Sequence, residues 1–244
     1  MRSVLWGLLI FVVCLPLAFV LFLIPAAKFP AMDAFTMKLP MGIRSAVAEM
    51  TLNNADYGKD SSKATDRAIQ FDPDNAEAWA QRCHGEYDET RISLAACRKA
   101  IALNPSGSNF NGQGTAQERA KDYCAAEDSY TRAIQASSNN ATYLRNMARA
   151  ALRCGHVGAS VAGFEVAEGL DAKAAADSDE EDDVKTDLVT DREYLPVVYG
   201  KTNEQAKAGA ACAKAHADWK SCQCELNDAG VKCSGVPADS VSKK

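Results

Sequence analysis

The pattern of apolar and polar positions divides the chain into four segments. Residues 1–28 are almost wholly apolar and are followed, over residues 41–172, by apolar and small residues that recur at helical spacing. That spacing predicts packed amphipathic helices. Residues 173–200 begin with a cluster of acidic side chains and are predicted to form an acidic linker. Residues 201–244 are rich in alanine and cysteine and are predicted to form a helical tail.

The apolar N-terminal segment predicts a transmembrane helix. Residues 4–27 carry no charge, and at about 1.5 Å per residue such a helix crosses a hydrocarbon core of roughly 30 Å. A cleaved signal peptide has a shorter apolar region, about 7–15 residues, and remains the alternative. Arg2 before the segment favours a cytoplasmic N-terminus, which would place the rest on the periplasmic or extracellular side. Cleavage would instead release a secreted protein that begins near Lys28.

A short sequence recurs along the central segment and predicts a repeat protein. Its copies are Arg-Ala-Ile-Gln at 67–70, Lys-Ala-Ile-Ala at 99–102 and Arg-Ala-Ile-Gln at 132–135, with a fourth register at Ala167. The spacing is close to a repeat of about 34 residues. Proline follows the first two copies, and because proline disfavours helix in the residue before it, each copy is expected to end a helix.

Packing residues in the later copies resemble those of the tetratricopeptide repeat (TPR) family. Residues 72–79, Asp-Pro-Asp-Asn-Ala-Glu-Ala-Trp, read like the family's turn between repeats and the tryptophan that follows it. Large and small residues of the third and fourth units match the family's spacing, namely Phe110, Gly114, Tyr123, Ala126, Tyr130, Ala133, Leu144, Met147, Ala148, Ser160, Phe164 and Ala167. The resemblance implies an all-α solenoid of about four helix-turn-helix repeats, with a concave groove that binds segments of other proteins.

Composition and motifs narrow the function further. Aromatic residues make up only 7% of the chain, which favours close-packed helices over sheets, and the net charge of −5 argues against non-specific nucleic-acid binding. The sequence has no phosphate-binding glycine loop, haem motif or nucleophile elbow. We therefore expect no enzymatic activity, no catalytic residue, no cofactor and no metal.

The chain has nine cysteines, and an even number, eight, remain when Cys14 of the apolar segment is set aside. Such a number suits a compartment in which disulfides form. The resemblance implies that Cys83 faces Cys97 within one repeat, and that Cys124 and Cys154 meet between adjacent helices. The alternative is that these four residues are buried free thiols.

The tail contains four further cysteines, Cys212, Cys222, Cys224 and Cys233. Their spacing lacks the paired Cys-x2–4-Cys of structural zinc sites, so two disulfides are favoured over zinc or copper. A redox or metal-handling protein that acts through these cysteines is nevertheless the alternative function.

One basic stripe is the candidate binding feature. Arg145, Arg149 and Arg153 are four residues apart and share a helix face, with Asn146 beside them. In the TPR family these positions line the groove, where arginines would bind a protein or peptide with an acidic or carboxylate-bearing segment. The alternative is a solvated face whose arginines pair with Glu118 or the acidic linker. We accordingly predict a membrane-anchored scaffold for protein–protein interaction.

Overall fold

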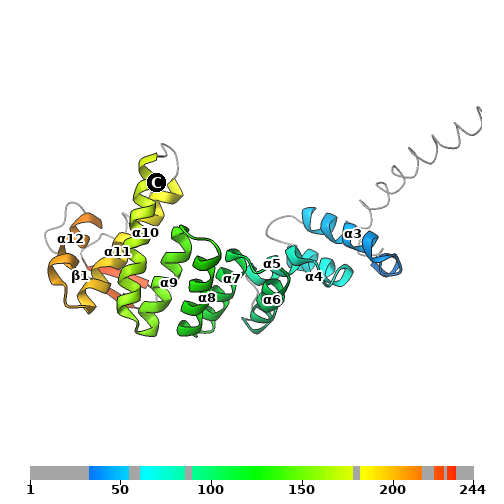
Figure 1. Cartoon of the computed structure of the whole chain (residues 1–244), viewed down its shortest axis with the longest axis horizontal. Helices are drawn as coiled ribbons and strands as arrows, with labels where there is room; N and C mark the ends of the chain where they lie inside the picture. Colours follow the sequence, from blue (N-terminus) through cyan, green and yellow to red (C-terminus); the bar gives the residue numbers. More distant parts are fainter. Residues whose placement is uncertain are drawn as a thin grey trace, which may run out of the picture. The chain divides into compact units, whose positions relative to one another are not determined.

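The computed structural model describes residues 33–54, 61–85, 90–177, 182–215, 223–227 and 230–234. The chain divides into two compact units, Met1–Pro105 and Ser106–Lys244 (Figure 1). Within each unit, consecutive helices pack against each other as pairs. The predicted helix pairs are thus confirmed, although residues 41–172 belong to two units and not to one.

In the part of unit 1 that the structure describes there are two helix pairs, in which α3 packs on α4 and α5 packs on α6. Its helices are α2 (Asp33–Thr36), α3 (Met41–Asn53), α4 (Ser61–Phe71), α5 (Ala76–His84) and α6 (Thr90–Leu103). The turn before α5 is set by its own residues, because the Asn75 side chain accepts a hydrogen bond from the Ala78 amide. The Trp79 indole donates to the carbonyl of Pro73 at 2.8 Å, which ties the new helix to the turn.

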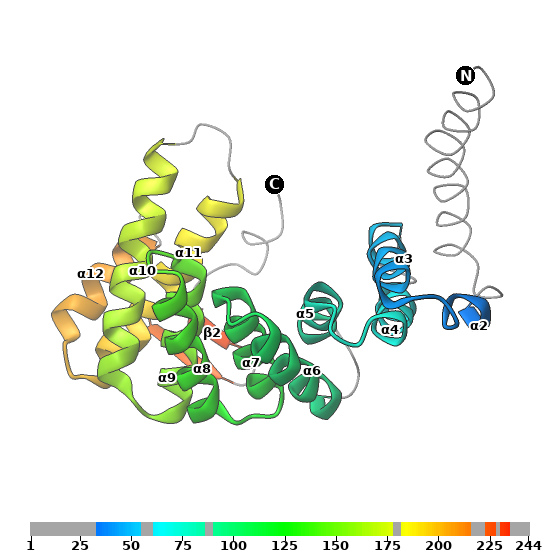
Figure 2. The ribbon, with the colours of Figure 1, turned by 45° about the vertical axis from the view of Figure 1, so that its right-hand side comes forward.

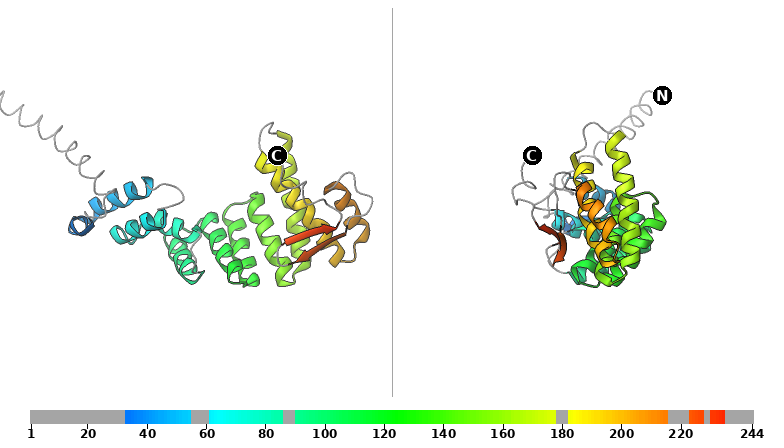
Figure 3. Two further views of the ribbon diagram at one scale, coloured as in Figure 1. Left: turned by 180° about the vertical axis from the view of Figure 1, so that it is seen from behind. Right: turned by 90° about the vertical axis from the view of Figure 1, so that its left-hand side faces the viewer.

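In its described residues, unit 2 contains three helix pairs and a β-hairpin (Figures 2 and 3). Side chains of Ser106, Asp122 and Asn140 accept hydrogen bonds from the first turns of three of its helices. Its elements are α7 (Gly107–Arg119), α8 (Tyr123–Ala136), α9 (Ala141–Cys154), α10 (Val157–Asp177), α11 (Asp182–Lys201), α12 (Gln205–Ala215), β1 (Gln223–Asn227) and β2 (Gly230–Ser234).

The predicted acidic linker over residues 173–200 is wrong. Helix α10 continues to Asp177, and α11 begins at Asp182 and packs against α10. Tyr194 and Val198 of α11 lie in the main apolar cluster of unit 2, together with Phe164 of α10. The run Tyr-Leu-Pro-Val-Val-Tyr at 194–199 is apolar enough to require burial, and this outweighs the acidic residues before it.

The tail is only partly helical, which corrects the predicted helical tail over 201–244. Helix α12 ends at Ala215, and residues 223–227 form a strand that pairs antiparallel with residues 230–234. The hairpin packs along α11 (Figure 3). Its closing pair is Asn227 and Gly230, and such residues favour a tight turn over a continued helix.

The predicted single-pass membrane location is also corrected. Among the residues that the structure describes, no helix is both long enough and apolar enough to cross a bilayer. The segment predicted to do so, residues 4–27, lies outside the described residues.

Close packing of α9 on α10 depends on a glycine. A Cβ atom built on Gly163 of α10 would lie 2.8 Å from the Ala148 Cβ and 3.3 Å from the Leu144 carbonyl oxygen of α9. Neither of these atoms is at the end of a flexible side chain, so the helices would have to separate. A Cβ at Gly158 of the same helix would meet nothing within 4 Å.

We expect Gly163→Ala to lower the free energy of unfolding by about 1–3 kcal/mol, because it overpacks the α9–α10 contact. Gly158→Ala is the matched control and is expected to raise stability by about 0.5–1 kcal/mol, since alanine favours a helix where space is open. Urea denaturation followed by circular dichroism measures both. Equal effects of the two variants would contradict this account of the packing.

Candidate binding face on helices α7 and α9

Arg145, the first arginine of the predicted stripe, is buried and cannot contact a partner. Only 5% of its surface is exposed. Its guanidinium donates from Nε to Asp191 of α11 at 2.7 Å and from Nη2 to Asp171 of α10. Because one arginine faces two carboxylates, its positive charge is fully used inside unit 2.

The two aspartates compete for the same cation. Burial raises the pKa of Asp191 to about 7 against the opposing effect of Arg145, and the neighbouring Asp171 carboxyl adds to the rise. A proton on Asp191 removes the excess negative charge below that pH. The cluster is therefore a structural link between α9, α10 and α11.

Further along α9, half-exposed polar side chains connect it to α7. The Asn146 amide donates to Asn111 Oδ1 at 2.9 Å. Arg149 donates from Nη2 to Asn146 Oδ1 at 3.0 Å and to Glu118 Oε2 at 3.2 Å. These four residues form one hydrogen-bonded network across the two helices, which we call the α7–α9 network.

A side chain of α8 also contacts the α7–α9 network. Tyr130 is fully buried, and its hydroxyl donates to Glu118 Oε2 at 2.7 Å. Burial raises the pKa of that hydroxyl, and the nearby Glu118 carboxylate raises it further. Gly114 leaves room for the ring, because a Cβ there would lie 2.6 Å from it. Glu118 is thereby held in position to neutralise Arg149.

Arg153, at the end of the stripe, is placed differently. Its guanidinium lies 5.3 Å from the centre of the Tyr123 ring. Among the described residues, no carboxylate lies within ion-pair distance of Arg153. Of the three arginines, Arg153 thus retains a charge that a partner can use.

The three arginines of the predicted stripe therefore lie in three different environments. The sequence predicted only some of the residues that contact them. Glu118 and the acidic linker over residues 173–200, which contains Asp191, were anticipated as partners of the arginines. Asp171 was not, because no sequence signal links it to Arg145. Asn111 could have been found, since it precedes Asn146 by 35 residues, close to one repeat period.

The predicted cysteine pairs are placed as follows. Disulfides join Cys83 to Cys97 and Cys124 to Cys154, with Cα–Cα distances of 4.5 and 5.0 Å. Cys212 is buried and also disulfide-bonded.

The remaining tail cysteines are less fully described. Cys224 and Cys233 are opposite each other in the hairpin register, whereas Cys222 lies outside the described residues. The pairing of the tail cysteines remains a prediction that chemical mapping can test.

Comparisons with known proteins identify the class of fold. No family model and no curated protein matches the sequence. Solved TPR structures do resemble the chain, among them YrrB, described as "a TPR protein with an unusual peptide-binding site", at 16% identity and a TM-score of 0.55. That likeness covers 72% of this chain and 84% of YrrB.

Two further structures show the same likeness. MamA 41-end from Desulfovibrio magneticus RS-1 has 10% identity and a TM-score of 0.57, covering 74% of this chain and 96% of that one. The C-terminal part of a TPR repeat-containing protein from Cytophaga hutchinsonii has 18% identity and a TM-score of 0.55, covering 75% and 72%. The chain has a TPR-like fold, as its packing residues indicated.

Because Arg145 is buried against two aspartates, its removal should destabilise unit 2. We expect Arg145→Met to lower the free energy of unfolding by about 3–5 kcal/mol, since it leaves buried carboxylates without a cation. Arg149→Met, which breaks a half-exposed pair on the same helix, should cost about 1 kcal/mol or less. Urea denaturation at neutral pH compares them, and a smaller loss for Arg145→Met than for Arg149→Met would overturn the assignment.

The raised pKa of Asp191 predicts a pH dependence. The folded protein binds this proton more tightly than the unfolded chain, whose aspartate pKa is about 4. The protonated Asp191 therefore makes its full contribution to the free energy of unfolding below a pH of about 4. That contribution is lost as the pH rises through 7. Asparagine mimics the protonated acid, so the stability of Asp191→Asn relative to wild type should rise from pH 5 to pH 8, by on the order of 2 kcal/mol.

Wild type, measured at each of the same pH values, is the reference for this series. Urea midpoints at several pH values supply the data. A stability difference for Asp191→Asn that does not change with pH would contradict a raised pKa.

Proposed function

We propose that this protein binds a peptide, or an extended segment of another protein, along the α7–α9 network, and acts as a scaffold and not as an enzyme. The observation that carries the proposal is the pair of half-exposed amides, Asn111 and Asn146. They come from adjacent repeats and lie on neighbouring helices of a TPR-like fold. The likeness to YrrB, whose description names a peptide-binding site, supports the same kind of ligand.

The side chains suit main-chain recognition. An asparagine amide offers both donors and an acceptor, which is what an extended peptide backbone requires. The hydrogen bonds to Arg149 and Asn111 already fix the orientation of Asn146. Because its rotamer is set before binding, less conformational entropy is lost when a peptide docks.

Charge favours a carboxylate-bearing partner. Arg149 is neutralised by Glu118, and Arg145 is buried, so the available cation on this face is Arg153. A carboxylate from an acidic side chain or a chain end can pair with its guanidinium while the Tyr123 ring supports the opposite side.

The test begins with selection of peptides from a displayed random library on the full-length protein. A selected peptide, synthesised with a free and with an amidated C-terminus, is then titrated by fluorescence anisotropy. We expect Arg153→Ala to weaken binding of the carboxylate-bearing form about tenfold, the equivalent of about 1.4 kcal/mol. Asn146→Ala should weaken binding of every selected peptide, because it removes a main-chain contact.

Arg132→Ala is the matched control, since Arg132 on α8 also stacks on an aromatic ring, 4.3 Å from the centre of Phe110. Its affinity should equal that of wild type. If Arg132→Ala and Arg153→Ala weaken binding equally, the carboxylate assignment is wrong. If Asn146→Ala leaves all affinities unchanged, the α7–α9 network is not the binding face.

A further inference from the structure

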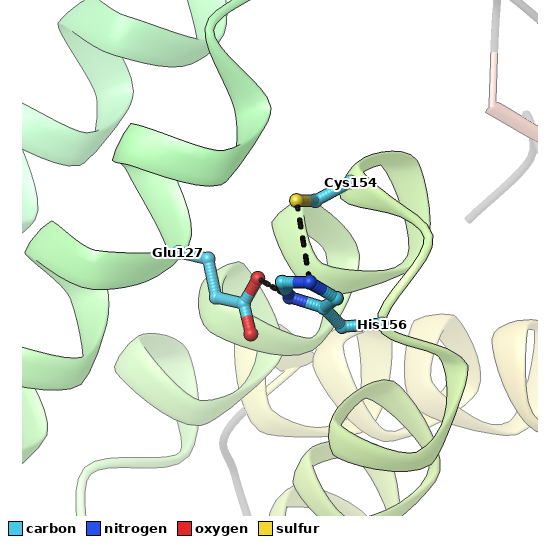
Figure 4. A group of neighbouring side chains, drawn as sticks. All are labelled: Glu127, Cys154 and His156. Carbon is cyan, nitrogen blue, oxygen red and sulfur yellow. Dashed lines mark hydrogen bonds and ion pairs between the residues drawn. The ribbon is translucent and has the colours of Figure 1, made fainter.

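A cluster of cysteine, histidine and glutamate side chains, separate from the α7–α9 network, lies where α8 meets the turn between α9 and α10. Cys124 is in the first turn of α8, and Glu127 follows it on the same helix. Cys154 ends α9, and His156 immediately precedes α10. Figure 4 shows Glu127, Cys154 and His156 directed toward one another.

The imidazole of His156 is oriented by the carboxylate. Its Nδ1 lies 2.7 Å from Glu127 Oε2, and its Nε2 lies 3.9 Å from the Cys154 sulfur (Figure 4). With the proton on Nδ1, the ring donates to Glu127 and directs the Nε2 lone pair toward the sulfur. A carboxylate on the far nitrogen is the usual support of a metal-binding histidine.

The backbone holds this geometry in place. Gly155, between the cysteine and the histidine, has φ of 95°, a left-handed conformation that glycine adopts without strain. The His156 carbonyl accepts the Ser160 amide at 3.1 Å, which fixes the start of α10. Ligand atoms of Glu127, Cys154 and His156 consequently all lie within 4.8 Å of one another.

We infer that reduction of the Cys124–Cys154 disulfide opens a site for a thiophilic divalent cation such as Zn²⁺, held by both sulfurs and by His156 Nε2. A dithiol reductant supplies two electrons and two protons, becomes a cyclic disulfide, and leaves two thiols on the protein. Cation binding then releases those two protons and forms two metal–thiolate bonds and one metal–nitrogen bond. Water completes the four-coordinate set that zinc prefers.

The disulfide is accessible to such a reductant. Cys124 is exposed and Cys154 is half-buried, whereas Cys83 and Cys97 of the other pair are buried. Cys124–Cys154 is accordingly reduced before Cys83–Cys97. The Cα–Cα distance of 5.0 Å lets both sulfurs remain near one cation after the bond has opened.

The test uses the full-length chain, reduced with a non-coordinating phosphine and titrated with Co²⁺ as a spectroscopic probe. Reduced wild type should develop sulfur-to-cobalt charge-transfer absorption, which the oxidised protein lacks. His156→Ala should bind Co²⁺ at least tenfold more weakly. His84→Ala is the matched control, because it lies beside Cys83 of the other pair, and it should match wild type.

Glu127→Gln tests the positioning role. It should lower cobalt affinity about 10–100-fold while the charge-transfer spectrum keeps its shape, because the metal's own ligands are unchanged. Coincident titration curves for wild type and His156→Ala would overturn the proposal, since other cysteines would then account for the bound metal.

A second measurement, of thermal stability and helical content, keeps the proposal testable if reduction unfolds the protein. Zn²⁺ should raise the melting temperature of reduced wild type and His84→Ala, since a ligand that binds only the folded state stabilises it. If reduction unfolds the chain, Zn²⁺ should restore the helical circular dichroism of these two proteins but not of His156→Ala. An equal response of His156→Ala would reject the site.

Discussion

The stacking of Tyr194 on Phe164 holds α11 against the helices before it, and the rest of unit 2 depends on that contact. The ring centres are 4.8 Å apart, and the planes are within 14° of parallel. Phe164 is fully buried, so without α11 this ring of α10 would face water. The contact also places Asp191, one turn before Tyr194, beside Arg145 of α9. The same packing that completes the core therefore removes an arginine from the predicted basic stripe.

Helix pairs could be predicted from the sequence because their causes are local. Ala68, Ala100 and Ala133 are buried small residues, and their regular spacing is visible without any structure. Helix α11 of the third pair was missed because it does not repeat the short sequence shared by the earlier pairs, and the acidic residues at its start resemble a linker. Helix α11 is stabilised by packing on Phe164, which is distant in sequence and is buried by this contact. The apolar run at 194–199 indicates that this segment needs burial, but the sequence does not show which helix it packs against.

The basic stripe shows the same limit for a candidate site. Helical periodicity correctly predicts that Arg145, Arg149 and Arg153 share one face of a helix. It does not predict which elements pack on that face. Successive turns of α9 lie under α11, beside α7 and against Tyr123, so the three arginines have three environments. The partner of Arg145 is 46 residues away in the chain and lies in an element that the sequence did not reveal. A search for equivalent positions one repeat apart could have found Asn111 and Asn146, but not the buried partners of Arg145.

The proposed binding face and the proposed thiol site meet at the end of α9 but use different contacts. Arg153 and Cys154 are adjacent in sequence, and they reach Tyr123 and Cys124, which are adjacent on α8. The two helices are thus joined here both by a disulfide and by a cation–π contact. Opening the disulfide removes the covalent link alone, while Arg153 still contacts Tyr123 and the α7–α9 network lies nearer the start of α9. Because Asn146 and His156 are held by different partners, loss of either site leaves the other site's contacts in place.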